Sequence, residues 1–300
     1  MRRWCDPSRV RELRSSSVKR TLTTASGVHL KVSYNLQKQP EKAATVILLH
    51  GWLGSSESPY IVSLSQALLS QGFNVIRLNF RDHGHTEALN PEVFHSCRLQ
   101  EMIEACEYIQ QQFPKQALSL IGFSLGANFV LRINADSDPS HLRLHRVISF
   151  CPVLSAENSL LALESGPELY RRYFMYRWRQ ILRRKEQAFP KLYAKNKLAQ
   201  IQDLRSGTDY LVQHCTDFTD LKQYMDGYSV IGDRLQQLQT QCHIVLAKDD
   251  PIIPWRDHQK LATSHKLEVY ISEHGGHCGF LDARLGSPWI DQYCLDVLSS

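Results

Sequence analysis

The feature that most constrains the fold is a series of short runs, rich in β-branched and other apolar residues, separated by longer segments of helical character. Such runs are expected of strands that are buried on both faces of a sheet. They lie at residues 45–49, 73–78, 117–121, 146–150, 243–247 and 267–271. Helices are predicted at 58–71, 92–112, 125–135, 255–264 and 288–298. This alternation predicts an α/β fold with a mostly parallel central sheet and helices on both faces.

The alternation is interrupted in two places. Residues 19–37 alternate in polarity around Ser26-Gly27, which predicts an antiparallel hairpin at the edge of the sheet. Residues 155–238 are predicted to be almost entirely helix and loop, and we interpret them as a helical cap inserted between core strands. With residues 1–18 as a basic N-terminal arm, we predict a single domain over residues 1–300.

Charge and cysteine content narrow the class of protein. The net charge is +5, and the positive residues are concentrated in two segments: residues 171–197 hold ten Lys or Arg, and residues 1–20 hold seven. Because the rest of the chain is not basic, we predict no nucleic-acid partner. No apolar run approaches the ~18 residues that span a bilayer, and no apolar segment follows the basic N-terminus, which predicts a cytoplasmic protein. The eight cysteines form no CxxC pair, which argues against a zinc module or a disulfide framework.

A candidate nucleophile lies in the pentapeptide Gly122-Phe123-Ser124-Leu125-Gly126, between a predicted strand and a predicted helix. That context is the one in which Gly-x-Ser-x-Gly forms a nucleophile elbow. The tight turn strains the serine backbone, and a Cβ atom at Gly122 or Gly126 would collide with the neighbouring strand and helix. Ser124 is therefore predicted to be a catalytic nucleophile.

Candidate partners for Ser124 follow the last two predicted strands. Asp249 and Asp250 come after the run 243–247, and His274 and His277 come after the run 267–271. All four would lie at the carboxyl ends of parallel strands, where open α/β sheets bind their ligands. Pro251 favours an extended backbone at Asp250. The residues alone leave open which aspartate and which histidine act with Ser124.

The chain resembles the α/β-hydrolase superfamily along nearly its full length, because the serine, aspartate and histidine follow in that order and His50-Gly51 follows the first parallel strand. The finer resemblance is to the YheT-like branch, whose members are generally described as candidate esterases. It is carried by Asn79-Phe80-Arg81-Asp82-His83-Gly84, Gly122-Phe123-Ser124-Leu125-Gly126-Ala127, Tyr228-Ser229-Val230, Asp249-Asp250-Pro251 and His274-Gly275-Gly276-His277-Cys278-Gly279-Phe280. Close relatives often have Gly in place of Ala127.

The resemblance implies a role for each site residue. Asp250 is the acid, because the family places it directly before a short apolar stretch ending in Pro, and His277 is the base, because it follows two glycines. The backbone N–H groups of Trp52 and Leu125 form the oxyanion hole, and His50 supports its loop. No metal and no organic cofactor is implied.

The segment Arg81-Asp82-His83-Gly84-His85 has a His-x-His spacing that a metal ion could use. No second cluster of ligands accompanies it, and similar loops shape this corner in metal-free relatives. We predict a structural role for it.

The function predicted is a carboxylesterase that cleaves lipid-like or other small acyl esters through an acyl-enzyme. A thioesterase, amidase, lyase or acyltransferase would use the same residues, and a non-catalytic protein could use the pocket to bind a ligand or partner.

The cap contains an amphipathic helix. One side is apolar, and Arg177 lies within it; the other side is basic. The apolar side consists of Tyr170, Tyr173, Phe174, Trp178, Ile181 and Leu182, and the basic side of Arg171, Arg172, Arg179 and Arg183. The first interpretation is that the aromatic side packs on the core. The second is a weak peripheral contact of the basic side with an anionic membrane.

Overall fold

The computed structural model of the protein describes residues 7–193, 201–280 and 289–299. Eight strands form one sheet, in the order β1-β2-β4-β3-β5-β6-β7-β8. They are β1 (Val18–Thr23), β2 (His29–Asn35), β3 (Thr45–Leu49), β4 (Asn74–Leu78), β5 (Leu118–Phe123), β6 (Leu144–Phe150), β7 (Cys242–Ala247) and β8 (Leu267–Ser272). β2 pairs antiparallel with β1 and β4, and all other pairs are parallel. The predicted sheet and its edge hairpin are therefore confirmed.

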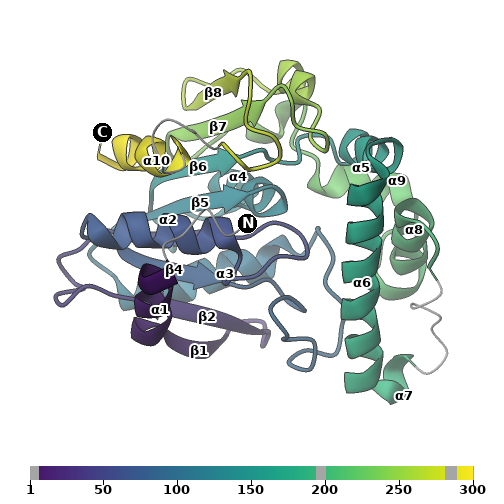
Figure 1. Cartoon of the computed structure of the whole chain (residues 1–300), viewed down its shortest axis with the longest axis horizontal. Helices are drawn as coiled ribbons and strands as arrows, with labels where there is room; N and C mark the ends of the chain where they lie inside the picture. Colours follow the sequence, from purple (N-terminus) through teal and green to yellow (C-terminus); the bar gives the residue numbers. More distant parts are fainter. Residues whose placement is uncertain (1–6, 194–200, 281–288, 300) are drawn as a thin grey trace.

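Burial along the strands follows their place in the sheet. Every residue of β3, β4 and β5 is buried, as expected of central strands between two helical layers. For β8 the prediction of burial on both faces is wrong, since Val269 and Tyr270 are 37% and 47% exposed. The reason is that β8 is the outermost strand, where the helical layers end (Figure 1).

Two helical layers cover the sheet (Figure 1). One layer holds α1 (Pro7–Ser16), α2 (Pro59–Ser70) and α10 (Trp289–Ser299), and the other holds α3 (Leu99–Gln112) and α4 (Leu125–Asp136). The helix α1 belongs to the predicted N-terminal arm, whose residues 1–6 lie outside the described residues.

Two of the predicted helices differ from the observed ones. The helix expected at 92–112 begins only at Leu99, because the preceding loop uses its backbone in tertiary hydrogen bonds: the Phe94 amide donates to Asp82 and the Ser96 amide donates to Tyr224. The segment expected as a helix at 255–264 is a short 3-10 helix, Trp255–Lys260. It ends where Leu261 pairs with Gly232 in a β-bridge.

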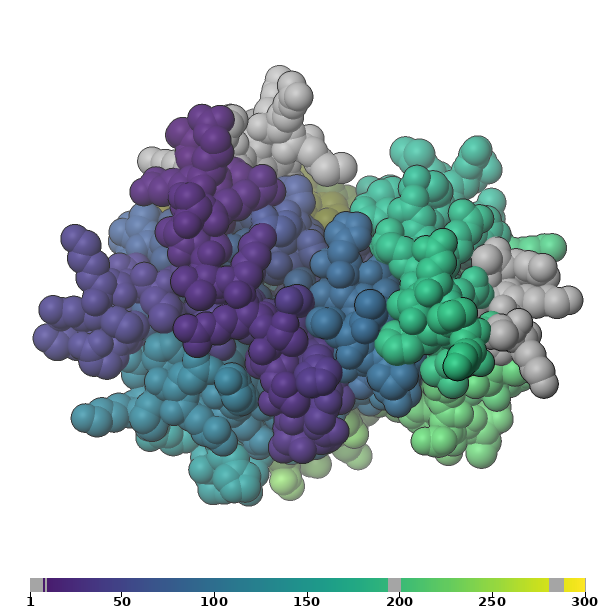
Figure 2. Space-filling view, turned by 90° about the horizontal axis from the view of Figure 1, so that it is seen from below, coloured from purple at the N-terminus to yellow at the C-terminus, as the bar shows by residue number. Residues whose placement is uncertain are grey.

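A helical insertion between β6 and β7 contains α5 (Ala156–Ser165), α6 (Glu168–Ala188), α7 (Pro190–Tyr193), α8 (Leu204–Cys215) and α9 (Leu221–Tyr228). It forms one end of the molecule, with α6 along its side (Figures 1 and 2). Its two ends are held together, since the Val230 amide donates to the Leu154 carbonyl at 2.8 Å and Asn128 of α4 donates to the carbonyls of Val153 and Tyr228. No helix in the described ranges is both long and apolar enough to cross a membrane.

The buried face of α6 differs from the predicted apolar stripe. Trp178, Ile181 and Leu182 are buried as expected, but Tyr170 and Tyr173 are 39% and 48% exposed. The N-terminal part of α6 borders a surface cavity instead of the core, which leaves these two rings accessible. Toward the C-terminal end of α6, the buried side of the helix also includes a charged residue. This residue is Lys185, which is fully buried.

Lys185 is buried because it ties α6 to the loop after β4. Its ammonium group donates to Asp82 Oδ1 at 2.7 Å and also to the carbonyls of Glu87 and Asn90. Asp82 Oδ2 accepts from the Phe94 amide at 2.8 Å. The Asp-x-Gly-His loop is thus a structural element, as predicted, and it is the point at which the insertion is anchored on the core.

Candidate active site

The elbow places Ser124 between β5 and α4 in a strained conformation, with φ 54° and ψ −117°. A Cβ atom at Gly122 would lie 2.3 Å from the Gly126 carbonyl oxygen, and one at Gly126 would lie 2.4 Å from the carbonyl oxygen of His50. Both distances are far below a van der Waals contact. The glycines are therefore required where the sequence pattern predicted them, and they allow β5 and α4 to present the Ser124 hydroxyl at the carboxyl edge of the sheet.

The structure brings His277 and Asp250 to Ser124. His277 Nε2 lies 2.9 Å from Ser124 Oγ, and His277 Nδ1 lies 2.9 Å and 3.2 Å from the two carboxylate oxygens of Asp250. The Asp250 side chain is 1% exposed and also accepts hydrogen bonds from the amides of Ile252 and Ile253, at 2.8 and 3.1 Å. This chain of hydrogen bonds can pass a proton from the hydroxyl to the imidazole while the carboxylate orients the ring.

Asp249 and His274, the other candidates, lie away from Ser124. Asp249 accepts hydrogen bonds from the amides of Gly275 and Gly276, at 2.9 and 2.8 Å, and so holds the loop that carries His277. The His274 side chain is 91% exposed and lies 3.7 Å from Asp249. The geometry therefore separates two adjacent aspartates into one that contacts the histidine and one that shapes its loop.

The electrostatics of the site favour a charged histidine next to a charged carboxylate. Burial raises the pKa of Asp250, but the charge of His277 and the hydrogen bonds from His277 and the two amides together hold that pKa below its usual value. Burial lowers the pKa of His277, yet the charges of Cys278 and Asp250 and the hydrogen bond to Asp250 raise it overall. The site thus stabilises the ion pair that would form when the serine loses its proton.

The amides predicted to bind an oxyanion belong to Trp52, in the loop after β3, and to Leu125, the first residue of α4. Within the described part of the chain, neither amide donates to a protein acceptor. The loop is fixed from behind by His50, whose Nδ1 lies 2.8 Å from the Gly51 carbonyl and whose pKa burial lowers to about 3. His50 is therefore neutral and donates through Nδ1, which agrees with the supporting role expected of it.

The cap also holds the Trp52 loop, which the sequence did not reveal. The Trp52 indole stacks on Phe174, with ring centroids 5.6 Å apart, and packs edge-on against Trp178 at 5.4 Å. Arg177, on the same side of α6, donates to the Leu53 carbonyl at 3.0 Å. Leu53 has φ 60°, so the arginine fixes a strained turn beside Trp52. The only sequence signal was the position of Arg177 within an otherwise apolar arc.

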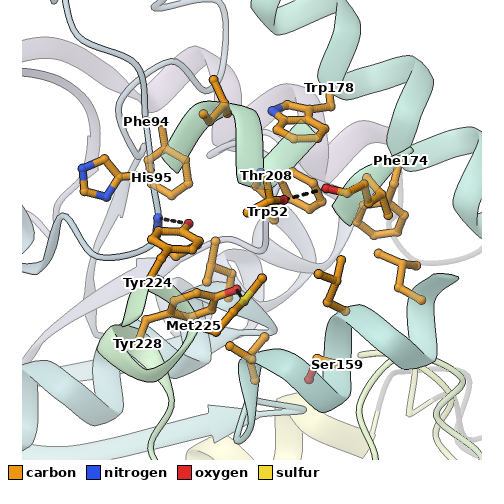
Figure 3. A pocket seen from close by; sticks show the side chains of 18 of the residues that line it. Trp52, Phe94, His95, Ser159, Phe174, Trp178, Thr208, Tyr224, Met225 and Tyr228 are labelled. Carbon is orange, nitrogen blue, oxygen red and sulfur yellow. Dashed lines mark hydrogen bonds between the residues drawn. The ribbon is translucent and has the colours of Figure 1, made fainter. Parts of the chain in front are cut away.

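Two cavities meet at Ser124. The inner cavity, of about 120 Å³, lies beneath the cap, and Figure 3 shows Trp52, Phe174 and Trp178 on one side of it and Phe94, Tyr224 and Tyr228 on the other. The outer cavity, of about 600 Å³, is open to solvent. It is lined by Ser124, His277, Tyr60, Cys278 and the N-terminal part of α6, including Leu169, Tyr170 and Tyr173. Ser124 can therefore contact a ligand that occupies both cavities.

Comparisons with known proteins agree with this architecture. Residues 44–284 match the family described as alpha/beta hydrolase fold. The chain is 24% identical over 271 residues to "Putative esterase YheT" of Escherichia coli strain K12. The aligned region covers 87% of this chain and 78% of that protein. It is 22% identical over 288 residues to monoacylglycerol lipase ABHD2 of Mus musculus, covering 85% of this chain and 65% of the lipase.

A solved structure, that of the Pyrococcus furiosus esterase Pf2001, superimposes with a TM-score of 0.63 at 13% identity. The superposition covers 96% of this chain and 94% of the esterase. At that identity the likeness concerns the fold. The superposition agrees with the family match over residues 44–284, which shows that the chain belongs to the alpha/beta hydrolase fold family.

Proposed function

We propose that the protein is a serine hydrolase that cleaves carboxylic esters, with Ser124 as nucleophile, His277 as general base and acid, and Asp250 as the residue that orients His277. The observation that carries the proposal is the hydrogen-bonded series from Ser124 Oγ through His277 to Asp250, at the junction of two cavities. The esterase and lipase names of distant relatives are consistent with it.

In the proposed reaction, Ser124 Oγ attacks the ester carbonyl carbon as His277 Nε2 takes its proton. The amides of Trp52 and Leu125 bind the oxyanion, and a site that loses one such donor typically turns over about 10²–10³-fold more slowly. The alcohol leaves with the proton from His277. A water molecule, deprotonated by the same imidazole, then cleaves the acyl-enzyme and restores Ser124.

The two cavities suggest how the substrate lies. The inner cavity is lined mainly by aromatic and aliphatic side chains, including Leu160, Leu211 and Met225, and suits an acyl chain. The outer cavity opens to solvent and suits the alcohol portion. We therefore propose lipid-like or other small apolar acyl esters as substrates.

The test is labelling with a fluorophosphonate, together with turnover of p-nitrophenyl esters graded by acyl length. Wild-type protein should be labelled and Ser124→Ala should not, with turnover reduced to background. Ser65→Ala is a matched control, since Ser65 is a buried serine of α2 that donates within its own helix. Folded wild-type protein that stays unlabelled while a control hydrolase reacts would refute the enzymatic proposal.

We further propose that the cap makes a weak peripheral contact with anionic membranes. The N-terminal part of α6 exposes Leu169 and Tyr176, 78% and 60% accessible, next to the exposed Arg171 and Arg172. Leu169 also lines the outer cavity, so a bilayer surface at this helix would lie at the entrance to Ser124. Apolar side chains flanked by arginines match a negatively charged lipid surface.

Sedimentation with liposomes tests this contact. Wild-type protein should pellet with anionic vesicles at low salt and much less with zwitterionic vesicles or at high salt. Replacing both Arg171 and Arg172 by Gln should weaken pelleting, whereas Lys222→Gln, in α9, should not. Protein that remains in the supernatant with anionic vesicles at low salt would exclude the contact.

A further inference from the structure

Two thiols lie beside His277. Cys151 directly follows β6 and Cys278 follows His277, and both side chains are buried. The two sulfur atoms and a ring nitrogen of His277 all lie within 4.8 Å of one another. The two cysteines are far apart in the sequence, so no ligand spacing could reveal the cluster. The fold alone assembles it.

The hydrogen bonds that the two thiols make to carbonyl groups in the described ranges are long. Cys151 Sγ contacts the Gly276 carbonyl at 3.7 Å and Cys278 Sγ contacts the Phe150 carbonyl at 3.8 Å, and a thiol is a weak donor. Both cysteines have positive φ, 46° and 62°. The surrounding structure therefore fixes the two sulfur atoms in place at a cost in backbone strain.

The types of the three ligand atoms and the distances between them suit a soft divalent cation. Zinc binds thiolate sulfur at about 2.3 Å and imidazole nitrogen at about 2.0–2.1 Å, so tetrahedral ligands are about 3.4–3.8 Å apart. From separations within 4.8 Å, the three donors would need to approach one another by at most about 1.0–1.4 Å. Two sulfurs and one nitrogen also match the preference of zinc and cadmium over magnesium or calcium.

An ion can reach the cluster from solvent. His277 and Cys278 line the outer cavity together with Ser124, while Cys151 lies behind them. Three protein ligands leave a fourth coordination position for water.

We propose that Cys151, His277 and Cys278 form an inhibitory binding site for Zn²⁺ or a similar soft divalent cation. As the ion binds, both sulfurs bind as thiolates and the imidazole binds in its neutral form through a ring lone pair, so the protons carried by the thiols and by a charged His277 are released to solvent. If Nε2 is the ligand, the hydrogen bond to Ser124 is lost, and if Nδ1 is the ligand, the hydrogen bond to Asp250 is lost. The inhibitory effect rests on the proposed function, whereas the binding itself does not.

Binding is tested first, without any activity. The full-length reduced protein is titrated with Cd²⁺ and the ultraviolet thiolate-to-metal absorption is followed. Wild-type and Ser124→Ala proteins should each show a band that saturates at one equivalent. Cys151→Ser and Cys278→Ser should lose it, and Cys151→Ala serves as a second variant in case the serine variant does not fold. Cys215→Ser, a cysteine outside the cluster, should retain it.

Inhibition is tested next, by titrating Zn²⁺ into the ester assay. Wild-type activity should fall and return on adding a chelator, and the concentration for half inhibition should rise at least tenfold in each variant of the cluster that retains turnover. A wild-type protein without the cadmium band, or a band that survives in the folded variants of Cys151 and Cys278, would overturn the site. A normal band without zinc inhibition of an active enzyme would overturn its inhibitory role. A normal band in a protein without esterase activity supports the site and counts against the proposed function alone.

Discussion

Replacing Lys185 by Met is expected to destabilise the protein by about 3–5 kcal/mol. Met keeps the aliphatic stem and removes the charge. The Lys185 and Asp82 side chains are 0% and 2% exposed, so the substitution leaves a buried carboxylate that, among the described residues, keeps the hydrogen bond from the Phe94 amide alone. The carbonyls of Glu87 and Asn90 lose a donor at the same time. Breaking a buried pair by removing one partner is costly for these reasons.

Urea unfolding followed by tryptophan fluorescence measures the effect, because Trp178 lies in the same helix as Lys185. With a slope of about 3 kcal/mol per molar urea, the midpoint should fall by about 1–1.7 M. Arg172→Met, in the same helix, is the matched control. Arg172 pairs with Glu168 at 3.8 Å, and both side chains are exposed, 77% and 67%, so its loss should cost about 1 kcal/mol or less.

The double variant Asp82→Asn with Lys185→Met separates the charge from the packing. Without the carboxylate, no buried charge is left unpaired, and much of the lost stability should return. The reasoning is refuted if Lys185→Met costs less than about 1 kcal/mol, or if the double variant is no more stable than the single one.

Three further predictions concern the site. Asp250→Asn should lower kcat for ester turnover by about 10³–10⁴-fold, whereas Asp249→Asn should lower it less than tenfold; equal losses in steady-state kinetics would show that the two are not distinguished as described. Gly126→Ala should lower the free energy of unfolding, measured with urea, by about 1–3 kcal/mol; an unchanged free energy would contradict the tight packing of Gly126 against the end of β3. Arg177→Met should reduce kcat more than it raises KM, because Arg177 acts through the Leu53 turn; an increase in KM alone would argue against a positioning role.

Features of the site that depend on local sterics were predictable from the sequence. The glycines around Ser124 are needed because atoms within a few residues and one adjacent strand would otherwise collide, and such requirements leave a recognisable pattern. The alternation of strands and helices is similarly local. The choice of Asp250 over Asp249 came from the resemblance to a family. In the structure Asp250 contacts His277, and Asp249 accepts hydrogen bonds from the amides of Gly275 and Gly276.

Contacts between distant segments that belong to no family motif were not predictable. Nothing near Lys185 indicates that its partner is Asp82, about a hundred residues earlier, and a lysine in a basic helix is more often a solvated one. The same holds for Arg177 and the Leu53 carbonyl. The exposure of Tyr170 also depends on tertiary structure, because a helical pattern identifies an apolar face but not how much of its length a core will cover.

The closure of the insertion at its base has a consequence for how such a protein can vary. The Leu154 carbonyl and the Val230 amide, where the chain leaves and rejoins the core, are hydrogen-bonded at 2.8 Å, so the segment that carries α5 to α9 forms a loop whose ends already meet. A short turn could bridge the same two points without displacing β6 or β7. We therefore expect that the cap can be exchanged while the sheet beneath it stays unchanged. Replacing it would alter what reaches Ser124 while leaving in place the strand ends that carry Asp250 and His277.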